Sequence, residues 1–279
     1  MEPIGLLAGS GRFPLLFAAE AKRMNVPVLA LGIKGVTDPA LEQVAGPVTY
    51  FALGQISKPI ALLKSAGVTR AVMIGKVQHS SLFGGVRPDL RAIQVLARLK
   101  DKRTDTILKA VADEFSKDGI ELLSSATFLS HLIVAQGKLS ARGPTAQEAA
   151  DIRLGWAAAK AVAGFDIGQT VVVKDGAVIA VEAMEGTDAA VLRAHDIARS
   201  HGRKTALTVV KVAKPRQDLR FDIPVLGLDS LGVFAAAGVS AVAVEAGTAI
   251  IFDKDDFLRR ADAQKLAIVG VSPESMEAS

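Results

Sequence analysis

The densest group of chemically active side chains lies between residues 211 and 224, where the sequence reads KVAKPRQDLRFDIP. The stretch contains four cationic residues and the two carboxylates Asp218 and Asp222, and it directly follows the largely apolar run 206–210. Such a run predicts a buried strand, and open α/β sheets bind their ligands at the carboxyl ends of their strands. There, cations can hold a phosphate, and carboxylates can hold a metal ion or activate water. A solvated loop with local ion pairs is the alternative.

A glycine-containing turn, Gly9-Ser10-Gly11-Arg12, follows a predicted strand at 4–8 and precedes a predicted helix at 13–24. The glycines allow a tight turn, and the helix N-terminus offers free N–H groups and a partial positive charge to a phosphate. The dinucleotide-binding pattern is incomplete, because Pro14 replaces its third glycine and the second predicted strand ends without a carboxylate for a ribose. The turn therefore favours a nucleotide or sugar phosphate over NAD, and a purely structural turn is the alternative.

Lys76 and His79 follow a predicted strand at 71–75, where substrate-binding loops lie in such folds. Either side chain could contact a phosphate or a base, and an ordinary exposed loop is the alternative. Apolar residues within 82–86 and basic residues within 98–103 could together form a surface for a lipid or a bilayer. A solvated helix face is the interpretation that this charge pattern favours.

Acidic residues recur at every third position where a predicted strand meets a predicted helix, at Glu182, Glu185 and Asp188. Acidic side chains stabilise a helix N-terminus on their own, so capping and surface charge are sufficient to explain them. If the sheet brings Asp218 and Asp222 close, however, these carboxylates form a hard-oxygen site suited to Mg²⁺.

The elements that must position these residues follow a βαβ rhythm in the first half of the chain. Strands are expected at 4–8, 28–31, 48–52 and 71–75, and helices at 13–24, 56–66, 91–99 and 104–117. This alternation predicts a mostly parallel sheet with helices on its faces.

The second half has a different pattern. Thr145 and Glu148 form a capping box that opens an Ala-rich helix ending near 163. Strands at 170–173 and 177–181 flank the hairpin signal Lys174-Asp175-Gly176. Thr187 caps a helix to 199, and strands follow at 207–210, 240–244, 247–252 and 266–269.

The fold class is therefore α/β, with an N-terminal Rossmann-like parallel-sheet domain and a C-terminal α/β domain built on a mixed sheet. A breaker-rich stretch marks the boundary. The expected ranges are 1–135 for the first domain, 136–144 for a linker, 145–272 for the second domain and 273–279 for a disordered tail.

Composition excludes several functional classes. The chain has 279 residues and no cysteine, which excludes disulfides, thiolate zinc sites and a cysteine nucleophile. Its net charge is a mild +4, and its scarce aromatics and dispersed basic residues disfavour nucleic-acid binding. Neither a serine-hydrolase elbow nor a P-loop is present. No secretory signal and no apolar run of about 18 residues is seen, so we expect a cytoplasmic protein.

These motifs together resemble the bacterial UDP-2,3-diacylglucosamine pyrophosphatases of the lipid A pathway, of the type unrelated to calcineurin-like metallophosphoesterases. The resemblance rests on GLLAGSGRFP at 5–14, EGTD at 185–188 and, most specifically, QDLRFD at 217–222. It extends from the first predicted strand to Val271, without a departure at the motif positions.

The resemblance implies hydrolysis of UDP-2,3-diacylglucosamine to UMP and 2,3-diacylglucosamine 1-phosphate by two domains that hold the lipid nucleotide between them. It also implies dependence on a divalent cation, usually Mg²⁺, and peripheral association with the cytoplasmic face of the inner membrane. The second aspartate of the last motif, Asp222, is expected to be indispensable: its replacement by alanine should abolish turnover and largely preserve binding.

On this hypothesis Asp222 binds Mg²⁺ or orients the attacking water, helped by Asp188, the second expected metal ligand, and by Asp218. Positive charge from Lys214 and Arg220 stabilises the phosphoryl oxygens. The other expected substrate-binding residues are Gly9, Ser10, Gly11, Arg12, Lys76 and Thr187. A non-catalytic module that binds a nucleotide sugar or lipid, and an oxidoreductase with a divergent nucleotide fold, remain as alternatives. The oligomeric state is open, with a homodimer among the options.

Overall fold

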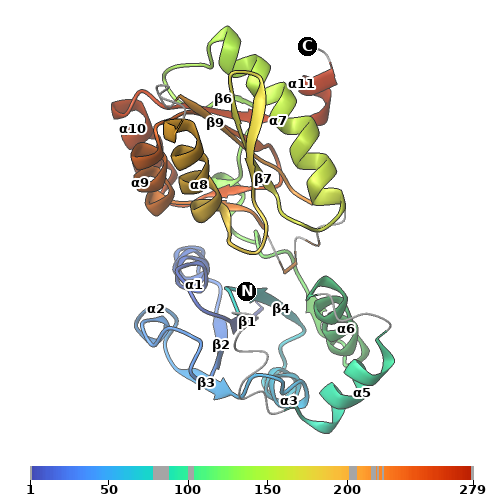
Figure 1. Cartoon of the computed structure of the whole chain (residues 1–279). Coiled ribbons are helices and arrows are strands. Elements are labelled where there is room, and N and C mark those ends of the chain that lie inside the picture. Colours follow the sequence, from blue (N-terminus) through green and yellow to red (C-terminus); the bar gives the residue numbers. More distant parts are fainter. Residues whose placement is uncertain are drawn as a thin grey trace. The chain divides into compact units, whose positions relative to one another are not determined.

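A computed structural model describes residues 2–77, 88–99, 104–200, 206–214, 218, 220–221 and 223–277. Asp222, His79 and the apolar residues of 82–86 thus lie outside the described residues. The chain divides into two compact units (Figure 1). Unit 1 comprises residues 1–130 together with 218–222, and unit 2 comprises residues 131–217 together with 223–279.

Unit 1 is a parallel sheet with helices on both faces, as expected for a Rossmann-like domain. Its strands are β1 (Ile4–Ala8), β2 (Val28–Ile33), β3 (Val48–Phe51), β4 (Arg70–Ile74) and β5 (Glu121–Leu122), in the order β3-β2-β1-β4-β5. All of these pairings are parallel. The order reverses direction at β1, which lies between β2 and β4. Ligands of open α/β sheets bind outside the strand ends at such a switch point.

The helices of unit 1 cover two apolar layers, because a parallel sheet must be buried on both faces. They are α1 (Phe13–Arg23), α2 (Leu41–Ala45), α3 (Ser57–Ser65), α5 (Leu90–Arg98) and α6 (Thr104–Lys117). Phe17 of α1 and Leu41 of α2 belong to one core cluster. Leu63 of α3, Val95 of α5 and Phe115 of α6 belong to the other.

Unit 2 contains the mixed sheet that the second half of the sequence predicts. Its principal strands are β6 (Gly137–Lys138), β7 (Thr170–Lys174), β8 (Ala177–Val181), β9 (Leu207–Lys211), β11 (Val239–Glu245) and β13 (Ala267–Val271), in the order β6-β13-β11-β9-β7-β8. Strands β13, β11 and β9 are parallel, whereas β6 and β7 run antiparallel to their neighbours. Two short strands, β10 (Val225–Leu226) and β12 (Ile250–Ile251), pair separately.

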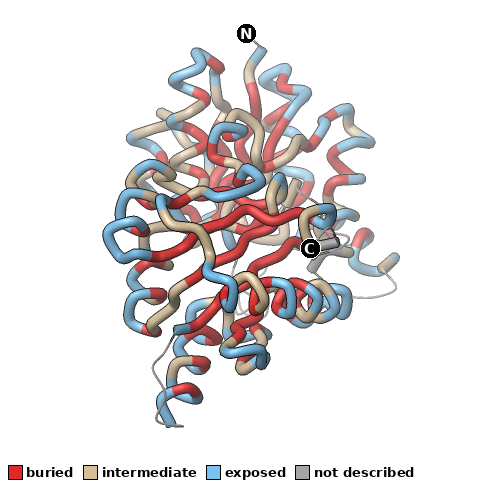
Figure 2. The backbone as a smooth tube through the Cα atoms, turned by 90° about the horizontal axis from the view of Figure 1, so that it is seen from above, coloured by how far each residue is buried: buried red, intermediate tan, exposed pale blue. Residues whose placement is uncertain are grey.

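Helices cover both faces of this sheet as well. They are α7 (Ala146–Gly164), α8 (Thr187–Ser200), α9 (Leu228–Ala237), α10 (Lys254–Ala263) and the terminal α11 (Pro273–Glu277), with a 3₁₀ turn at Ser130–Leu132. Trp156 of α7 packs in one core cluster. Val191 of α8, Phe234 of α9 and Phe257 of α10 pack in another. Buried backbone accordingly follows the strands in Figure 2, and the exposed segments lie on the outer helices and turns.

Several structures that local sequence signals predict are present. In the β7–β8 hairpin, Asp175 and Gly176 have φ of 50° and 80°, the positive values that a tight two-residue turn requires. Gly176 N–H also donates to Asp151 over 2.8 Å. Residues 136–144, the expected linker, contain β6 and are held on unit 2, where Ser140 Oγ accepts from Ile268 N–H at 2.7 Å. Residues 273–277, part of the expected disordered tail, form helix α11. Among the described residues, no helix combines the length and apolar character needed to cross a membrane.

The capping box of α7 is confirmed and is tied to an ion pair. Thr145 Oγ1 accepts from the Glu148 backbone, while Glu148 accepts from the Thr145 backbone. Arg142 donates to both carboxylate oxygens of Glu148, over 2.7 and 2.9 Å. Burial alone would raise the pKa of Glu148, but the hydrogen bonds from Arg142 and the backbone outweigh it and lower this pKa to about 2.

This lowered pKa predicts an acid-sensitive α7. A carboxyl group with a depressed folded-state pKa stabilises the fold above its unfolded pKa, here 4.5, and loses that contribution as the pH falls towards 2. At neutral pH, Glu148→Gln should therefore cost on the order of 2–3 kcal/mol of unfolding free energy. The difference from the wild type should shrink as the pH falls below 4.5. Urea unfolding followed by the fluorescence of Trp156, the one tryptophan of the chain, measures both.

The exposed carboxylate Glu121 offers a matched control, so that Glu121→Gln should leave the unfolding free energy nearly unchanged. A Glu148→Gln penalty that stays constant from neutral pH to below pH 4 would contradict this account.

Candidate functional site

The two loops at the switch point of unit 1 are joined by backbone. Ser10 N–H donates to Lys76 O over 2.9 Å, and Lys76 N–H donates back to Ser10 O over 3.0 Å. Ser10 Oγ also donates to Lys76 O over 2.8 Å. The structure therefore brings the predicted residues Ser10 and Lys76 together, at the carboxyl ends of β1 and β4.

Two glycines permit this contact. A Cβ on Gly9 would lie 2.8 Å from Lys76 O, and one on Gly75 would lie 2.8 Å from Gly9 C and from Ser10 O. Gly75 has φ of 105°, a value that disfavours any side chain. Gly9 and Gly75 thus serve close backbone packing at this turn. The cations beside it, Arg12 and Lys76, have exposed side chains.

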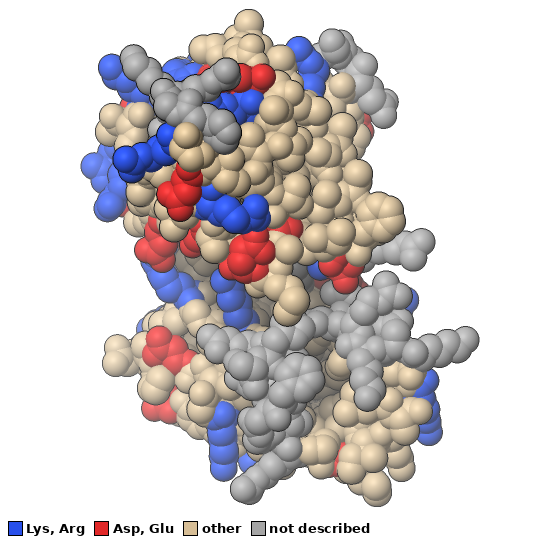
Figure 3. Space-filling view, in the orientation of Figure 1, with Lys and Arg blue, Asp and Glu red and all other residues tan. Residues whose placement is uncertain are grey.

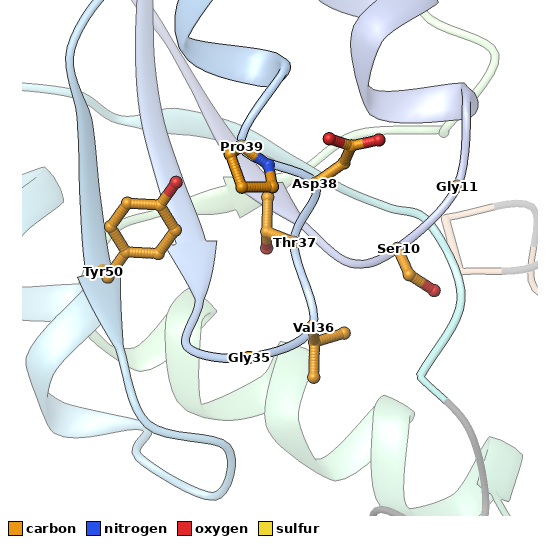
Figure 4. Close-up of a pocket in the computed structure, with 8 residues that line it drawn as sticks. All are labelled: Ser10, Gly11, Gly35, Val36, Thr37, Asp38, Pro39 and Tyr50. Atoms are coloured by element: carbon orange, nitrogen blue, oxygen red, sulfur yellow. The ribbon is translucent and has the colours of Figure 1, made fainter.

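A pocket of about 530 Å³ lies beside the same turn, at the carboxyl ends of β1 and β2 (Figure 4). It is lined by Ser10, Gly11, Gly35, Val36, Thr37, Asp38, Pro39 and Tyr50. Buried Thr37 fixes the loop, because its Oγ1 donates to Ala8 O and accepts from Ile33 N–H. The Asp38 carboxylate accepts from Ala40 N–H over 2.9 Å. This volume lies within the usual range for a small-molecule site.

Sequence reasoning found the Ser10–Gly11 side of this pocket and missed the loop Gly35–Pro39. The missed signal was the polar Thr37-Asp38-Pro39 turn after the second strand. In dinucleotide-binding folds this is the position of the group that contacts the ribose.

Asp218 and Arg220 of the charged motif belong to unit 1 and pair with each other. Arg220 Nη2 donates to Asp218 Oδ2 over 2.5 Å, and Nε donates to Oδ1 over 2.9 Å. These hydrogen bonds lower the pKa of Asp218, and the charge of Lys109 on α6 lowers it further. The Arg220 guanidinium also lies 5.1 Å from the Phe221 ring centroid, and Phe221 packs against the core cluster that includes Phe115. Asp218 therefore holds Arg220 in a fixed orientation.

In unit 2, a buried polar group lies at the carboxyl end of β9. The Lys211 ammonium donates to Thr187 Oγ1 over 2.8 Å and to Thr170 Oγ1 over 3.2 Å. Thr187 in turn donates to Glu182 over 2.8 Å. Lys211 and Glu182 are 5% and 8% exposed, so their charges compensate each other through Thr187 in a region of low dielectric. Asp188, the next residue of α8, is exposed.

A second ion pair, between half-buried Lys160 and buried Glu245, fixes the base of the charged loop. The Glu245 carboxylate, at the end of β11, accepts from Lys160 over 3.0 Å and from Ala213 N–H over 2.7 Å. Lys160 also donates to Ala213 O over 3.1 Å. Lys214, the predicted phosphate-binding cation, follows directly and pairs with Asp166. The sequence analysis did not identify Lys160 and Glu245, although a carboxylate that ends a buried strand was visible at 245.

The structure thus distributes the predicted residues between the units. Unit 1 holds Gly9 to Arg12, Lys76, Asp218 and Arg220, and unit 2 holds Thr187, Asp188 and Lys214. Within the described ranges there is no cluster of three or more His, Asp or Glu residues that could bind a metal ion. Glu182 and Asp218 already accept hydrogen bonds from their neighbours, whereas the Asp188 side chain lies at an exposed helix start.

Comparison with known proteins gives the same result for both halves of the chain. Residues 3–132 match the model of the LpxI N-terminal domain, and residues 135–269 match that of the LpxI C-terminal domain. The chain is also similar to the UDP-2,3-diacylglucosamine pyrophosphatase LpxI of Caulobacter vibrioides. The two are 30% identical over 280 residues, which cover 98% of this chain and 99% of that protein.

The close contact between the two switch-point loops predicts what an added side chain would do there. Gly75→Ala should destabilise the protein by about 2–4 kcal/mol, because the new methyl group meets backbone atoms that cannot move away. Gly67→Ala is the matched control, since Gly67 also has positive φ, at 67°, but has nothing within 4 Å of an added Cβ. It should cost only about 1 kcal/mol. Urea unfolding followed by circular dichroism measures both, and equal losses would contradict the packing role of Gly75.

Proposed function

The chain belongs to the LpxI family, and we propose that it hydrolyses the pyrophosphate bond of UDP-2,3-diacylglucosamine to give UMP and 2,3-diacylglucosamine 1-phosphate. The observation that carries this proposal is the match of both family domains in succession, together with the relative that bears this activity in its name. The charged residues at the strand ends of both units support it.

Attack of water on a diphosphate spreads negative charge over the phosphoryl oxygens, so positioned cations supply much of the catalysis. Arg220 is best suited to this role, because Asp218 orients its guanidinium before substrate arrives. A preoriented cation needs less reorganisation as charge develops. Asp218 thus contributes as a positioning residue, and Arg12, Lys76 and Lys214 add positive charge.

We assign the pocket beside Gly11 to the uridine half of the substrate. Its support is its place at the ends of β1 and β2, its volume and its polar lining. The Asp38 carboxylate can accept from a ribose hydroxyl, and the Tyr50 hydroxyl, which donates to Glu42 over 3.1 Å, lies at the same pocket. The free N–H groups at the start of α1 can donate to a phosphate of the substrate at this end of the sheet.

Asp222 is the proposed orienting group for the attacking water and, with Asp188, the proposed ligand of Mg²⁺. An exposed carboxylate such as Asp188 fits this role, because protein-bound Mg²⁺ uses one or two carboxylates together with substrate phosphates. When bound, Mg²⁺ would neutralise charge on the diphosphate. The diacylated substrate is the reason to place the reaction at the cytoplasmic face of the inner membrane, by peripheral contact.

Incubation of the purified full-length chain with UDP-2,3-diacylglucosamine in detergent micelles tests the proposal. Wild type with Mg²⁺ should release UMP and sugar 1-phosphate in equal amounts, detected by chromatography and ³¹P NMR. Excess EDTA should stop the release, and added Mg²⁺ should restore it. Asp222→Ala should lower kcat by about 10³-fold or more and still bind the substrate in calorimetry.

Asp196→Ala, at an exposed aspartate of α8, is the control and should keep the wild-type rate. Substrate binding without any UMP release by the wild type would contradict the proposed catalytic activity and favour a binding module. Unchanged activity in EDTA would contradict the proposed dependence on Mg²⁺. Wild-type activity of Asp222→Ala would contradict the proposed role of that carboxylate.

A further inference from the structure

Helix α5 of unit 1 exposes a row of large apolar side chains. Leu90 is 72% exposed, Ile93 50% and Leu96 40%. Positions three apart lie on neighbouring turns on the same side of a helix, so the three side chains form one continuous strip. Single exposed apolar residues are ordinary, but an adjacent row of them indicates a surface that binds a protein, a ligand or a membrane.

The helix is firmly attached to unit 1 on its other side, so this strip is a stable surface feature. Ala92 and Val95 are buried in the core cluster. The Asp89 carboxylate caps the helix by accepting from Ala92 N–H over 2.9 Å, and it also accepts from Ser57 N–H of α3 over 2.7 Å. Arg91 pairs with Glu114 of α6 over 2.6 Å. These contacts fix which side of α5 faces outward.

The charged residues near the strip indicate what kind of surface it contacts. Helix α5 contains two arginines and no acidic residue. Arg91 is paired with α6, whereas Arg98 at the last turn is exposed. Figure 3 shows the surface of unit 1 in this part as mostly uncharged. An apolar strip that ends in the exposed Arg98, on a helix without acidic residues, fits an interface whose hydrocarbon lies beneath anionic headgroups.

We infer that the Leu90–Ile93–Leu96 strip of α5 is the surface through which this protein docks on an anionic lipid bilayer. The inference rests on the proposed function, since a diacylated substrate resides in a membrane. The strip enters the headgroup layer, and Arg98 lies among the lipid phosphates. Docking brings the enzyme to its substrate without a membrane-spanning segment.

Co-sedimentation of the full chain with vesicles tests this docking without any substrate. Wild type should pellet with vesicles of phosphatidylglycerol and phosphatidylcholine, and less with phosphatidylcholine alone. The double variant Leu90→Ser, Ile93→Ser should lower the vesicle partition coefficient by about tenfold. Arg98→Glu should weaken binding only to the anionic vesicles, and this difference should vanish at high salt.

The matched control is Phe165→Ser with Ile167→Ser in unit 2, because these side chains are 80% and 52% exposed. This variant should bind vesicles like the wild type. Both double variants should keep the wild-type melting temperature and, on substrate in detergent micelles, the wild-type kcat/KM.

Three results would overturn the inference. Wild type that stays in the supernatant, or an equal loss in the two double variants, would remove α5 as the docking surface. A change from dimer to monomer in the α5 variant, seen by light scattering, would assign the strip to a second copy of the chain. A loss of micellar kcat/KM with unchanged vesicle binding would assign it to the acyl chains. Vesicle docking through α5 without UMP release by the wild type would instead contradict the proposed function alone.

Discussion

The two-point ion pair between Asp218 and Arg220 is the interaction on which the account of the site depends. It belongs to a short segment, 218–222, that counts with unit 1 although the residues on either side of it count with unit 2. A segment of this length cannot make a core of its own, so it is held by specific contacts. Phe221 packs against the unit 1 core cluster, and the charges of Lys109 and Asp113 on α6 attract Asp218 and Arg220, respectively. The doubly hydrogen-bonded pair lies within the segment and fixes its local conformation. Doubly hydrogen-bonded arginine–carboxylate pairs fix orientation as well as distance.

The chain that precedes this segment is anchored within unit 2 at Ala213. Glu245 accepts from the backbone of Ala213, and Lys160 contacts both groups. Ion pairs that bury a carboxylate such as Glu245 add little net stability, because desolvation offsets most of their attraction, but they do define one arrangement. The Lys211–Thr187–Glu182 group likewise holds the start of α8 in one position, because Thr187 is hydrogen-bonded to both charged side chains. Buried Glu182, Lys211 and Glu245 thus lie at strand ends that lead into the charged motifs.

Much of the fold could be predicted from the sequence, because its signals are local. The Thr145 capping box, the Lys174-Asp175-Gly176 hairpin and the βαβ alternation each depend on residues close together in the chain. The parallel and the mixed character of the two sheets followed from these patterns. Three of the four two-residue strands, β5, β6 and β10, were missed because two residues carry no periodic signal, whereas β12 lies within the expected strand 247–252.

The site could be predicted less well from the sequence, because its contacts join distant parts of the chain. Nothing near Gly75 indicates that its neighbour is Gly9, and Lys160 and Glu245 are 85 residues apart. That residues 218–222 count with unit 1 depends on α6, more than a hundred positions earlier. The glycine turn was expected to hold a phosphate, and the structure adds a packing reason for Gly9. Asp222 lies outside the described residues, so its role stays a prediction from the motif.

A double-mutant cycle across Asp218 and Arg220, read as kcat/KM for UMP release, tests the central claim most directly. If Asp218 acts by orienting Arg220, Asp218→Asn and Arg220→Gln should each lower kcat/KM by about tenfold or more. The double variant should then be no slower than the slower single variant, within about twofold. Losses that multiply in the double variant would show that the two side chains act independently, and would contradict the account.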